Sequence, residues 1–397
     1  MLIGIVVNIL NYLFNIFLAR NLTDTDFGFY NAAIGIITLA QIPTIAIQTA
    51  LTKKVAQNKK VNLKKFKTRS TLQLLIIAIS ISILFYLLGN YISYVASIPQ
   101  GYILPLTLVV FGAIFTPIIK GFLLGLEKIL SFNLILLFET LLKFLIAIIG
   151  IDFDIGITPP ILACVLPSLI TFLVIFPLIK TKSEKKPKKD IKLNYKTITL
   201  TFLTFLLLNV PFTLDLILVN QDVRASYGAL SLVGKITYFA SIMIATVMIS
   251  KLANSKEKDK KRNLLISLLI SALTGIGISL LILLFKEGIV SIMFDGKYTE
   301  IVNYVFPYSL AMTVYALSYM MITSLLVDDS YVHIYFLIFI SVLQATLFRM
   351  NNYTLHNVFI NQIVIYSALS VFTVIVLFFY IQKRNGEKEE KEIKQGS

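Results

Sequence analysis

Charged side chains are scarce in this sequence. Asp, Glu, Lys and Arg make up 14% of its 397 residues, against roughly 25% in a typical soluble domain. Two stretches, residues 71–86 and 264–285, contain no charged residue at all. The mean hydropathy is +0.83, and about 20 mostly apolar residues suffice to cross the hydrocarbon core of a bilayer as a helix. The composition therefore argues against a soluble domain and predicts an all-α integral membrane protein.

Cysteine and histidine are almost absent, which excludes several kinds of site. The single cysteine, Cys164, allows no disulfide within the chain and no metal site built from several thiolates. The two histidines, His333 and His356, lie near the ends of apolar stretches and well apart in sequence. We therefore expect no catalytic centre, no metal site and no cofactor, and we do not expect an enzyme.

Hydropathy divides the chain into about twelve transmembrane spans. No secretory pattern precedes the first of them, so we expect it to remain in the protein. Their approximate bounds, in chain order, are 1–19, 29–51, 71–95, 102–119, 129–150, 159–179, 197–219, 226–250, 264–285, 301–326, 333–348 and 358–381.

Basic residues gather in the connections on one side of these spans. That side holds 29 of the Lys and Arg residues, and the opposite side holds five. Such a bias predicts that the base-rich side is cytoplasmic and that both termini lie there, in a multi-pass protein of the cytoplasmic (inner) membrane. The net charge of +15 then reflects orientation and attraction to anionic membrane lipids. We expect no nucleic-acid partner.

An internal repeat divides the chain into two halves. Asn15 and Gly28 recur as Asp215 and Gly228, an offset of 200 residues that superposes span 1 on span 7 and span 2 on span 8. Six spans in each half predict two bundles in the same orientation, related by a parallel repeat. The expected domains are an N-terminal bundle (1–179), a basic cytoplasmic linker (180–196), a C-terminal bundle (197–381) and a charged cytoplasmic tail (382–397).

Three asparagines follow one face of the first span. Asn8, Asn11 and Asn15 are spaced three and four residues apart, and Arg20 follows near the outer end. Asparagine inside a membrane can hold helices together, or it can offer donors and acceptors to a sugar. Arg20 is either an interfacial anchor or a ligand of the substrate. All four are candidate substrate-binding residues.

Four ionisable residues lie within predicted spans, where such groups are costly and usually functional. Glu139 and Lys143 are four residues apart, so they can pair on one helix face or open toward a substrate and a proton. Asp215 follows Pro211, a kink signal, and can pair with Lys235 or line a cavity. We predict Lys143 and Lys235 as substrate-binding residues, and Glu139 and Asp215 as ion-coupling residues.

The stretch Asn11 to Thr49 resembles the opening of the polysaccharide (Wzx-type O-antigen or capsule) flippases, a family within the multidrug/oligosaccharidyl-lipid/polysaccharide exporter superfamily. In that family a helix ending in Leu-Ala-Arg precedes an acidic turn, an aromatic-Gly-x-Tyr and a helix with a proline. The matching elements, with three later and looser ones, are Leu18-Ala19-Arg20, Asp24 to Asp26, Phe27 to Tyr30, Pro43, Lys120 to Glu127, Asp215 to Tyr227 and Phe294 to Tyr298.

The resemblance implies alternating access between two six-helix bundles around a central cavity. The implied cargo is an undecaprenyl-diphosphate-linked oligosaccharide for surface polysaccharide synthesis, with polysaccharide polymerase machinery as a possible partner and coupling to H⁺ or Na⁺. Arg20, Lys143 and Lys235 would offset the charge of the diphosphate. The lipid II flippases of the superfamily have fourteen spans, and the chain ends after the twelfth, so the resemblance favours a polysaccharide cargo.

Two other functions stay open. A multidrug or small-molecule exporter of the same fold would favour acids over bases in its cavity, because many such substrates are cations. A membrane glycan polymerase or acyltransferase is the second alternative. Its external loops are usually long, whereas the longest one expected here spans about fifteen residues, 286–300. An acyltransferase usually needs an activated histidine or acid pair.

Overall fold

The computed structural model describes residues 2–57, 63–153, 155–179, 195–254, 257–327, 331 and 333–396. Every regular element within these ranges is a helix, which confirms the all-α prediction. The predicted basic linker lies outside the described residues up to position 194, and residues 195 and 196 begin a helix.

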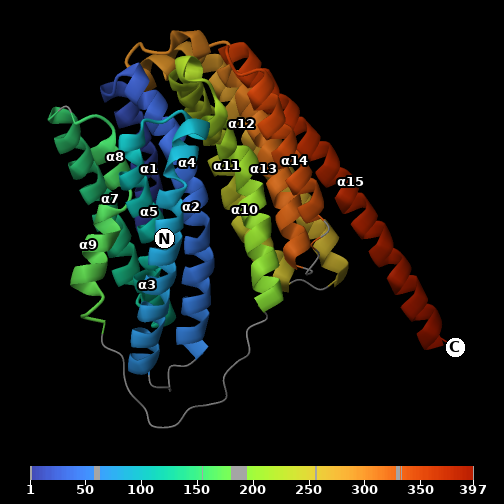
Figure 1. Cartoon of the computed structure of the whole chain (residues 1–397). Coiled ribbons are helices and arrows are strands. Elements are labelled where there is room, and N and C mark those ends of the chain that lie inside the picture. The colour runs from blue at the N-terminus through green and yellow to red at the C-terminus, as the bar shows by residue number, and fades with distance from the viewer. Residues whose placement is uncertain are drawn as a thin grey trace. The chain divides into compact units, whose positions relative to one another are not determined.

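The helices belong to two compact units (Figure 1). Unit 1 comprises Met1–Ile198 with Leu216–Ala225, and unit 2 comprises Thr199–Asp215 with Ser226–Ser397. In chain order the elements of the first part are α1 (Leu2–Asn21), α2 (Asp24–Gln57), α3 (Leu63–Leu87), α4 (Gly89–Ala96), η1 (Gln100–Tyr102), α5 (Ile103–Phe115), α6 (Pro117–Gly125), α7 (Ile129–Asp152), α8 (Thr158–Leu162) and α9 (Leu166–Ile175). The remaining elements are α10 (Tyr195–Leu218), α11 (Gln221–Asn254), α12 (Glu257–Phe294), η2 (Thr299–Ile301), α13 (Val305–Val327), α14 (His333–Met350) and α15 (Leu355–Gly396).

Nine stretches of the described chain are long and apolar enough to cross a membrane. Two further apolar helices, Leu166–Ile175 and Phe202–Leu218, are shorter. Several predicted spans are broken in the structure, because prolines and turns interrupt them. The span predicted at 102–119 contains α5 and α6, and the one at 159–179 contains α8 and α9. The chain is thus a multi-pass membrane protein, and twelve spans with both termini inside stay a prediction.

Two glycines let α6 lie against α2 in unit 1. A Cβ atom at Gly121 would stand 2.7 Å from Cβ of Leu51, and one at Gly125 would stand 2.5 Å from Cβ of Val55. In the hydrocarbon core, helices associate through close packing between small residues, since burial from lipid adds no hydrophobic gain. Gly121 and Gly125 therefore allow α6, which contains Lys120, to pack closely against α2.

Polar side chains surround the proline of α10 in unit 2. Pro211 has no N–H to donate, so the helix ladder is interrupted there. The Pro211 carbonyl accepts hydrogen bonds from the amides of Gln344 (3.1 Å) and Gln362 (2.8 Å), and the Leu208 carbonyl accepts one from the hydroxyl of Tyr315 (2.6 Å). Neighbouring helices thus supply donors to backbone carbonyls of this apolar helix, and they hold the segment that carries Asp215.

A buried arginine closes the turn after α10 in unit 1. The Arg224 side chain is 1% exposed, and its guanidinium donates to the carbonyls of Val219 (2.6 and 3.0 Å) and Ser97 (3.4 Å). Helix ends leave carbonyls without intrahelical partners, so this arginine completes the end of α10 and ties it to the end of α4.

Candidate functional site

Lys143 of unit 1 rests on an aromatic ring and an amide. Its ammonium lies 4.0 Å from the centroid of the Phe14 ring and donates to Oδ1 of Asn11 at 3.3 Å. Both partners belong to α1, which packs along α7. A ring face attracts a cation through its quadrupole, so both groups stabilise the ammonium, and neither carries a negative charge that would neutralise it.

Asn11 and Asn15 of α1 each donate from the amide within the helix and direct the amide oxygen to a neighbouring helix. The Asn11 amide donates to the Val7 carbonyl (3.0 Å) and the Asn15 amide donates to the Asn11 carbonyl (2.9 Å), both within the helix. The Asn15 oxygen accepts from the hydroxyl of Tyr30 at 3.2 Å. Asn8 and Arg20, the outer members of the predicted set, are both exposed. The structure therefore joins Asn11 to Lys143 and Asn15 to α2.

Glu139 has a different partner from the one expected on its own helix. Its carboxylate pairs with Lys120 of α6 at 2.8 Å and accepts from the Thr171 hydroxyl of α9 at 2.7 Å. The spacing allows Glu139 to pair with Lys143, and in the structure the two side chains instead contact different neighbours, Glu139 on α6 and Lys143 on α1. The side chains of this ion pair are 17% and 11% exposed, so it is mostly buried and neutralises the acid.

Lys120 directly follows the span predicted at 102–119, and the structure places it inside α6. Pro117 is the signal that indicates a helix here, since proline favours the first helical position. Gly121 and Gly125 then mark the face that approaches α2. Lys120 pairs with Glu139 because of how α6, α7 and α9 pack. The spacing of residues in the sequence does not predict that packing.

Asp215 of unit 2 is fully buried and hydrogen-bonded to tyrosine. The hydroxyl of Tyr227 donates to its carboxylate at 2.7 Å, and the hydroxyls of Tyr227 and Tyr308 lie 3.1 Å apart. The two rings meet edge to face, with centroids 6.0 Å apart. This chain of hydroxyls joins α10, α11 and α13. Neither tyrosine was singled out from the sequence, where aromatic residues are frequent.

Lys235 lies in the same unit over an aromatic cluster. It is 8% exposed, and its ammonium stands 4.2 Å from the ring centroid of Phe212. Phe212 is stacked on Tyr315 (5.5 Å between centroids) and touches Tyr238 (4.5 Å). Asp215 lies near enough to act electrostatically on Lys235. An amine and a carboxylate are thus buried among aromatic rings in one unit.

The two units contain corresponding polar pairs. In each, a polar residue of the first repeat helix accepts a hydrogen bond from a tyrosine of the second: Asn15 from Tyr30 and Asp215 from Tyr227. With the offset of 200 residues, Tyr227 corresponds to Phe27, which is about one helical turn from Tyr30. Unit 1 therefore has a neutral amide where unit 2 has a carboxylate.

Within the described ranges, no group of three or more His, Cys, Asp or Glu side chains is placed to hold a metal ion. A cavity of about 660 Å³ lies in unit 1, at one end of α3 and α9, and it is lined by none of the predicted site residues.

Known protein structures share the fold of this chain. The lipid II flippase MurJ in an inward closed conformation aligns with a TM-score of 0.69 and 14% identity, over 96% of this chain and 87% of MurJ. An inward-facing multidrug resistance MATE family transporter of the MOP superfamily aligns with a TM-score of 0.72 and 14% identity, over 96% of both chains. A MOP superfamily transporter from Pyrococcus furiosus, described as having a binding pocket of reverse polarity, aligns with a TM-score of 0.59 and 13% identity, over 96% of this chain and 93% of the other.

No protein-family model matches the chain, and no curated protein matches it in sequence. At identities of 13–14%, the structural similarity establishes the fold alone. Solved structures described as MOP superfamily transporters share that fold.

Proposed function

We propose that this protein flips an undecaprenyl-diphosphate-linked oligosaccharide across the cytoplasmic membrane by alternating access, for surface polysaccharide synthesis. The observation that carries this proposal is the setting of Lys143 and Lys235. Each amine lies within a membrane helix and rests on the face of a phenylalanine ring. The ring is neutral, so this contact does not neutralise the positive charge that a ligand would meet.

An anionic cargo fits these lysines on energetic grounds. A charge in the bilayer interior costs at least about 2.5–3.5 kcal/mol on insertion scales, and a cation–π contact returns about 2 kcal/mol when desolvated. A diphosphate would offset the remainder through charge-assisted hydrogen bonds. The oxygens of Asn11 and Asn15 would accept hydrogen bonds from sugar hydroxyls, with Asn8 and Arg20 farther along the same helix.

The coupling ion, H⁺ or Na⁺, would act at Asp215. Its carboxylate is fully buried and has a hydroxyl neighbour in Tyr227, so gain or loss of a cation there changes the charge of the site outright. Glu139 is less suited to this role, because Lys120 already neutralises it at 2.8 Å. We retain Glu139 as the second coupling candidate, since an ion pair can open.

Structures with this fold support a transporter, and they do not separate the two cargoes. The name of MurJ indicates a lipid-linked cargo for that protein, and the MATE structures are multidrug transporters. An exporter of cationic compounds is our second candidate, favoured by the buried carboxylate of Asp215 among aromatic rings. Membrane lipids and polysaccharide polymerase machinery are the proposed partners.

A flipping assay tests the leading proposal. The full-length protein is reconstituted into vesicles with a fluorescent undecaprenyl-diphosphate-oligosaccharide, and the fraction accessible to an external reagent is measured over time. We expect Lys143→Met and Lys235→Met each to reduce flipping at least tenfold, which corresponds to loss of about 1.4 kcal/mol of cargo binding. Lys143→Arg and Lys235→Arg retain the charge and should retain part of the activity.

Two exposed lysines serve as matched controls. Lys128 precedes α7 in the unit of Lys143, and Lys261 lies in α12 in the unit of Lys235. The variants Lys128→Met and Lys261→Met each remove one positive charge and leave the aromatic rings beside Lys143 and Lys235 unchanged. They should flip at the wild-type rate. Full activity of both Lys143→Met and Lys235→Met would refute the proposal. Export of cationic dyes that requires Asp215, with no flipping, would establish the second candidate instead.

A further inference from the structure

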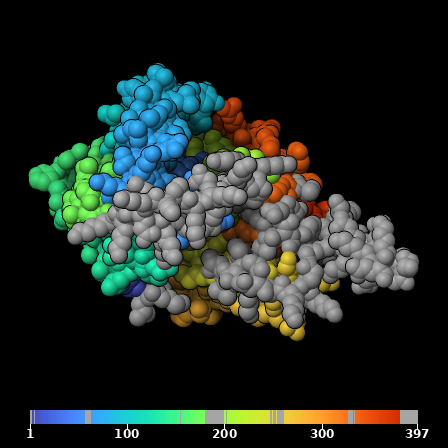
Figure 2. All heavy atoms as spheres, turned by 90° about the horizontal axis from the view of Figure 1, so that it is seen from below, coloured from blue at the N-terminus to red at the C-terminus, as the bar shows by residue number. Residues whose placement is uncertain are grey.

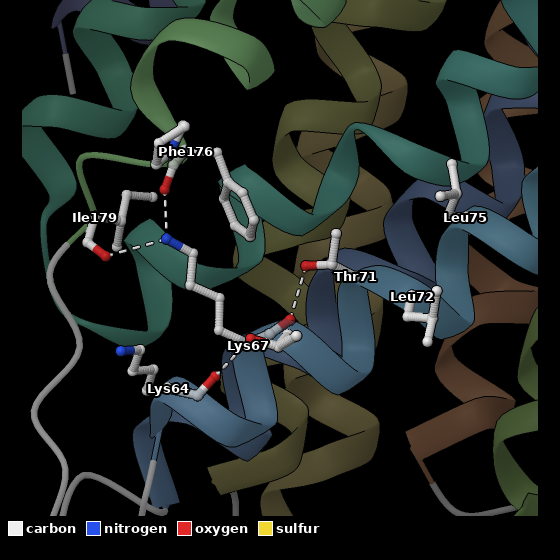
Figure 3. Close-up of a pocket in the computed structure, with 9 residues that line it drawn as sticks. Lys64, Lys67, Thr71, Leu72, Leu75, Phe176 and Ile179 are labelled. Atoms are coloured by element: carbon white, nitrogen blue, oxygen red, sulfur yellow. Dashed lines mark hydrogen bonds between the residues drawn. The ribbon is translucent and has the colours of Figure 1, made fainter.

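A pocket lies at the base-rich end of unit 1, apart from the site described above. It has a volume of about 660 Å³ and is formed by the first turns of α3 and the residues after α9 (Figure 3). On the face seen in Figure 2, the light-blue atoms of α3 lie next to the green ones of α9. The lining residues are Lys64, Lys67, Thr68, Thr71, Leu72, Leu75, Phe176, Pro177 and Ile179.

Lys67 is held in place by the end of α9. Its ammonium donates to the carbonyls of Ile179 (3.1 Å) and Phe176, and it lies 4.2 Å from the centroid of the Phe176 ring. The carbonyls at a helix end carry the negative end of the dipole, so a cation is stable there. An ammonium has three N–H groups. Within the described residues, two of them donate to these carbonyls, which leaves the third for a ligand.

Lys64 places a second positive charge at the same pocket. It lies one helical turn before Lys67 on α3, and Figure 3 shows both ammonium groups on the side of Ile179. The threonine hydroxyls donate to their own helix, Thr68 to the Lys64 carbonyl at 3.2 Å and Thr71 to the Lys67 carbonyl at 2.7 Å. The lysines are thus the donors available at this end, and the complementary ligand group is an anion.

The other end of the pocket is apolar. Leu72 and Leu75 follow within two turns of Thr68, and the Leu72 side chain is 56% exposed. Lys64 and Leu75 are separated by eleven residues, or about 16 Å along a helix. The pocket therefore changes from cationic to apolar over the depth of a lipid head group and the upper part of its acyl chain.

We propose that this pocket binds an anionic phospholipid from the leaflet on the base-rich side. Lys64 and Lys67 bind the phosphate, and the acyl chain lies along Leu72 and Leu75. The volume is within the range of about 300–1,000 Å³ that is usual for ligand sites, and anionic lipids are abundant at the cytoplasmic surface. A free phosphate would leave the apolar half unfilled. This lipid is separate from the proposed cargo and would be a resident of unit 1.

Native mass spectrometry of the purified full-length protein tests the proposal. The protein is mixed with phosphatidylglycerol or phosphatidylcholine, and the retained lipid is measured against lipid concentration. We expect phosphatidylglycerol to bind the wild type more tightly, and Lys64→Gln to weaken it about fivefold, as expected for one lysine at an anionic surface. Lys65→Gln is the matched control, because it removes the same charge from the next residue, which does not line the pocket.

A second variant identifies the source of the phosphate. Leu72→Asn should weaken phosphatidylglycerol retention, because the acyl chain loses apolar contact and a free phosphate has no acyl chain to lose. Equal losses in Lys64→Gln and Lys65→Gln would overturn the proposal in favour of general surface attraction. Full retention in Leu72→Asn, with displacement of the lipid by inorganic phosphate, would show that the pocket binds a free anion. Retention of undecaprenyl-diphosphate lipids alone would also overturn it.

Discussion

Two carboxylates are buried in the part of the chain that the structure describes, and they have different chemical partners. Glu139 faces a lysine, so its charge is balanced within unit 1. Asp215 accepts a hydrogen bond from Tyr227, a neutral donor, and acts electrostatically on Lys235. The charge of a balanced pair is costly to change, because loss of either partner leaves the other charge buried and unpaired. A carboxylate among hydroxyls and rings is better suited to a change of charge during transport.

The variant Asp215→Asn should distinguish the effect of the Asp215 charge on transport from its effect on stability. Asp215→Asn still accepts a hydrogen bond from Tyr227, as Asn15 does from Tyr30 in unit 1, so the melting temperature in detergent should change little. Transport should be lost, because no proton or sodium ion can be exchanged. Tyr227→Phe removes the donor instead and should destabilise unit 2 by about 1.5–3 kcal/mol, the value for a hydrogen bond to a charged group.

Melting curves and the flipping assay measure both effects. A melting temperature for Asp215→Asn as low as that of Tyr227→Phe would indicate that the charge of Asp215 is structural. Unchanged transport in Asp215→Asn would contradict its role in coupling.

Close packing of two helices depends on glycine positions, where no side chain holds the backbones apart. The approach of α6 to α2 at Gly125 brings the Thr52 carbonyl to 2.9 Å from the site where a Cβ would stand. Gly125→Ala should therefore push the helices apart and destabilise unit 1 by about 1–3 kcal/mol, the usual cost of overpacking. The measurement is the melting temperature of the purified protein in detergent.

Gly277 of α12 supplies the control. A Cβ there would meet nothing within 4 Å, and alanine has the higher helix propensity, by up to about 1 kcal/mol. Gly277→Ala should leave the melting temperature unchanged or raise it slightly. If Gly125→Ala were equally stable, the contact between α2 and α6 would have to be looser than the structure shows.

For the molecule as a whole, the predicted orientation in the membrane can be tested by labelling. The single native cysteine, Cys164, allows a cysteine-free background by one change, Cys164→Ser. On that background, Lys128→Cys should react with a membrane-impermeant maleimide only after permeabilisation, and Asp295→Cys should react on intact cells. The reason is the excess of basic residues in the connections on the side of Lys128. Labelling of both positions on intact cells would contradict the predicted orientation.

The sequence alone determined the properties that depend on composition along the chain. Low charge and long apolar runs predict membrane helices because a bilayer admits only backbones with internal hydrogen bonds. The same reasoning identified Glu139, Lys143, Asp215 and Lys235, since charges are conspicuous within apolar spans. It also identified the repeat that relates Asn15 to Asp215.

The tertiary structure decided which of these residues meet. Glu139 and Lys143 lie on one helix, yet Glu139 contacts Lys120 and Lys143 contacts Phe14, because α7 packs between different neighbours. Tyr227 and Tyr308 are 81 residues apart and meet at Asp215 only because α10, α11 and α13 pack together. Contacts between helices depend on their rotation and spacing, which are properties of the packed unit. The hydropathy of the sequence gives neither the rotation nor the spacing of the helices. For the same reason, the pocket between α3 and α9 was found only in the structure.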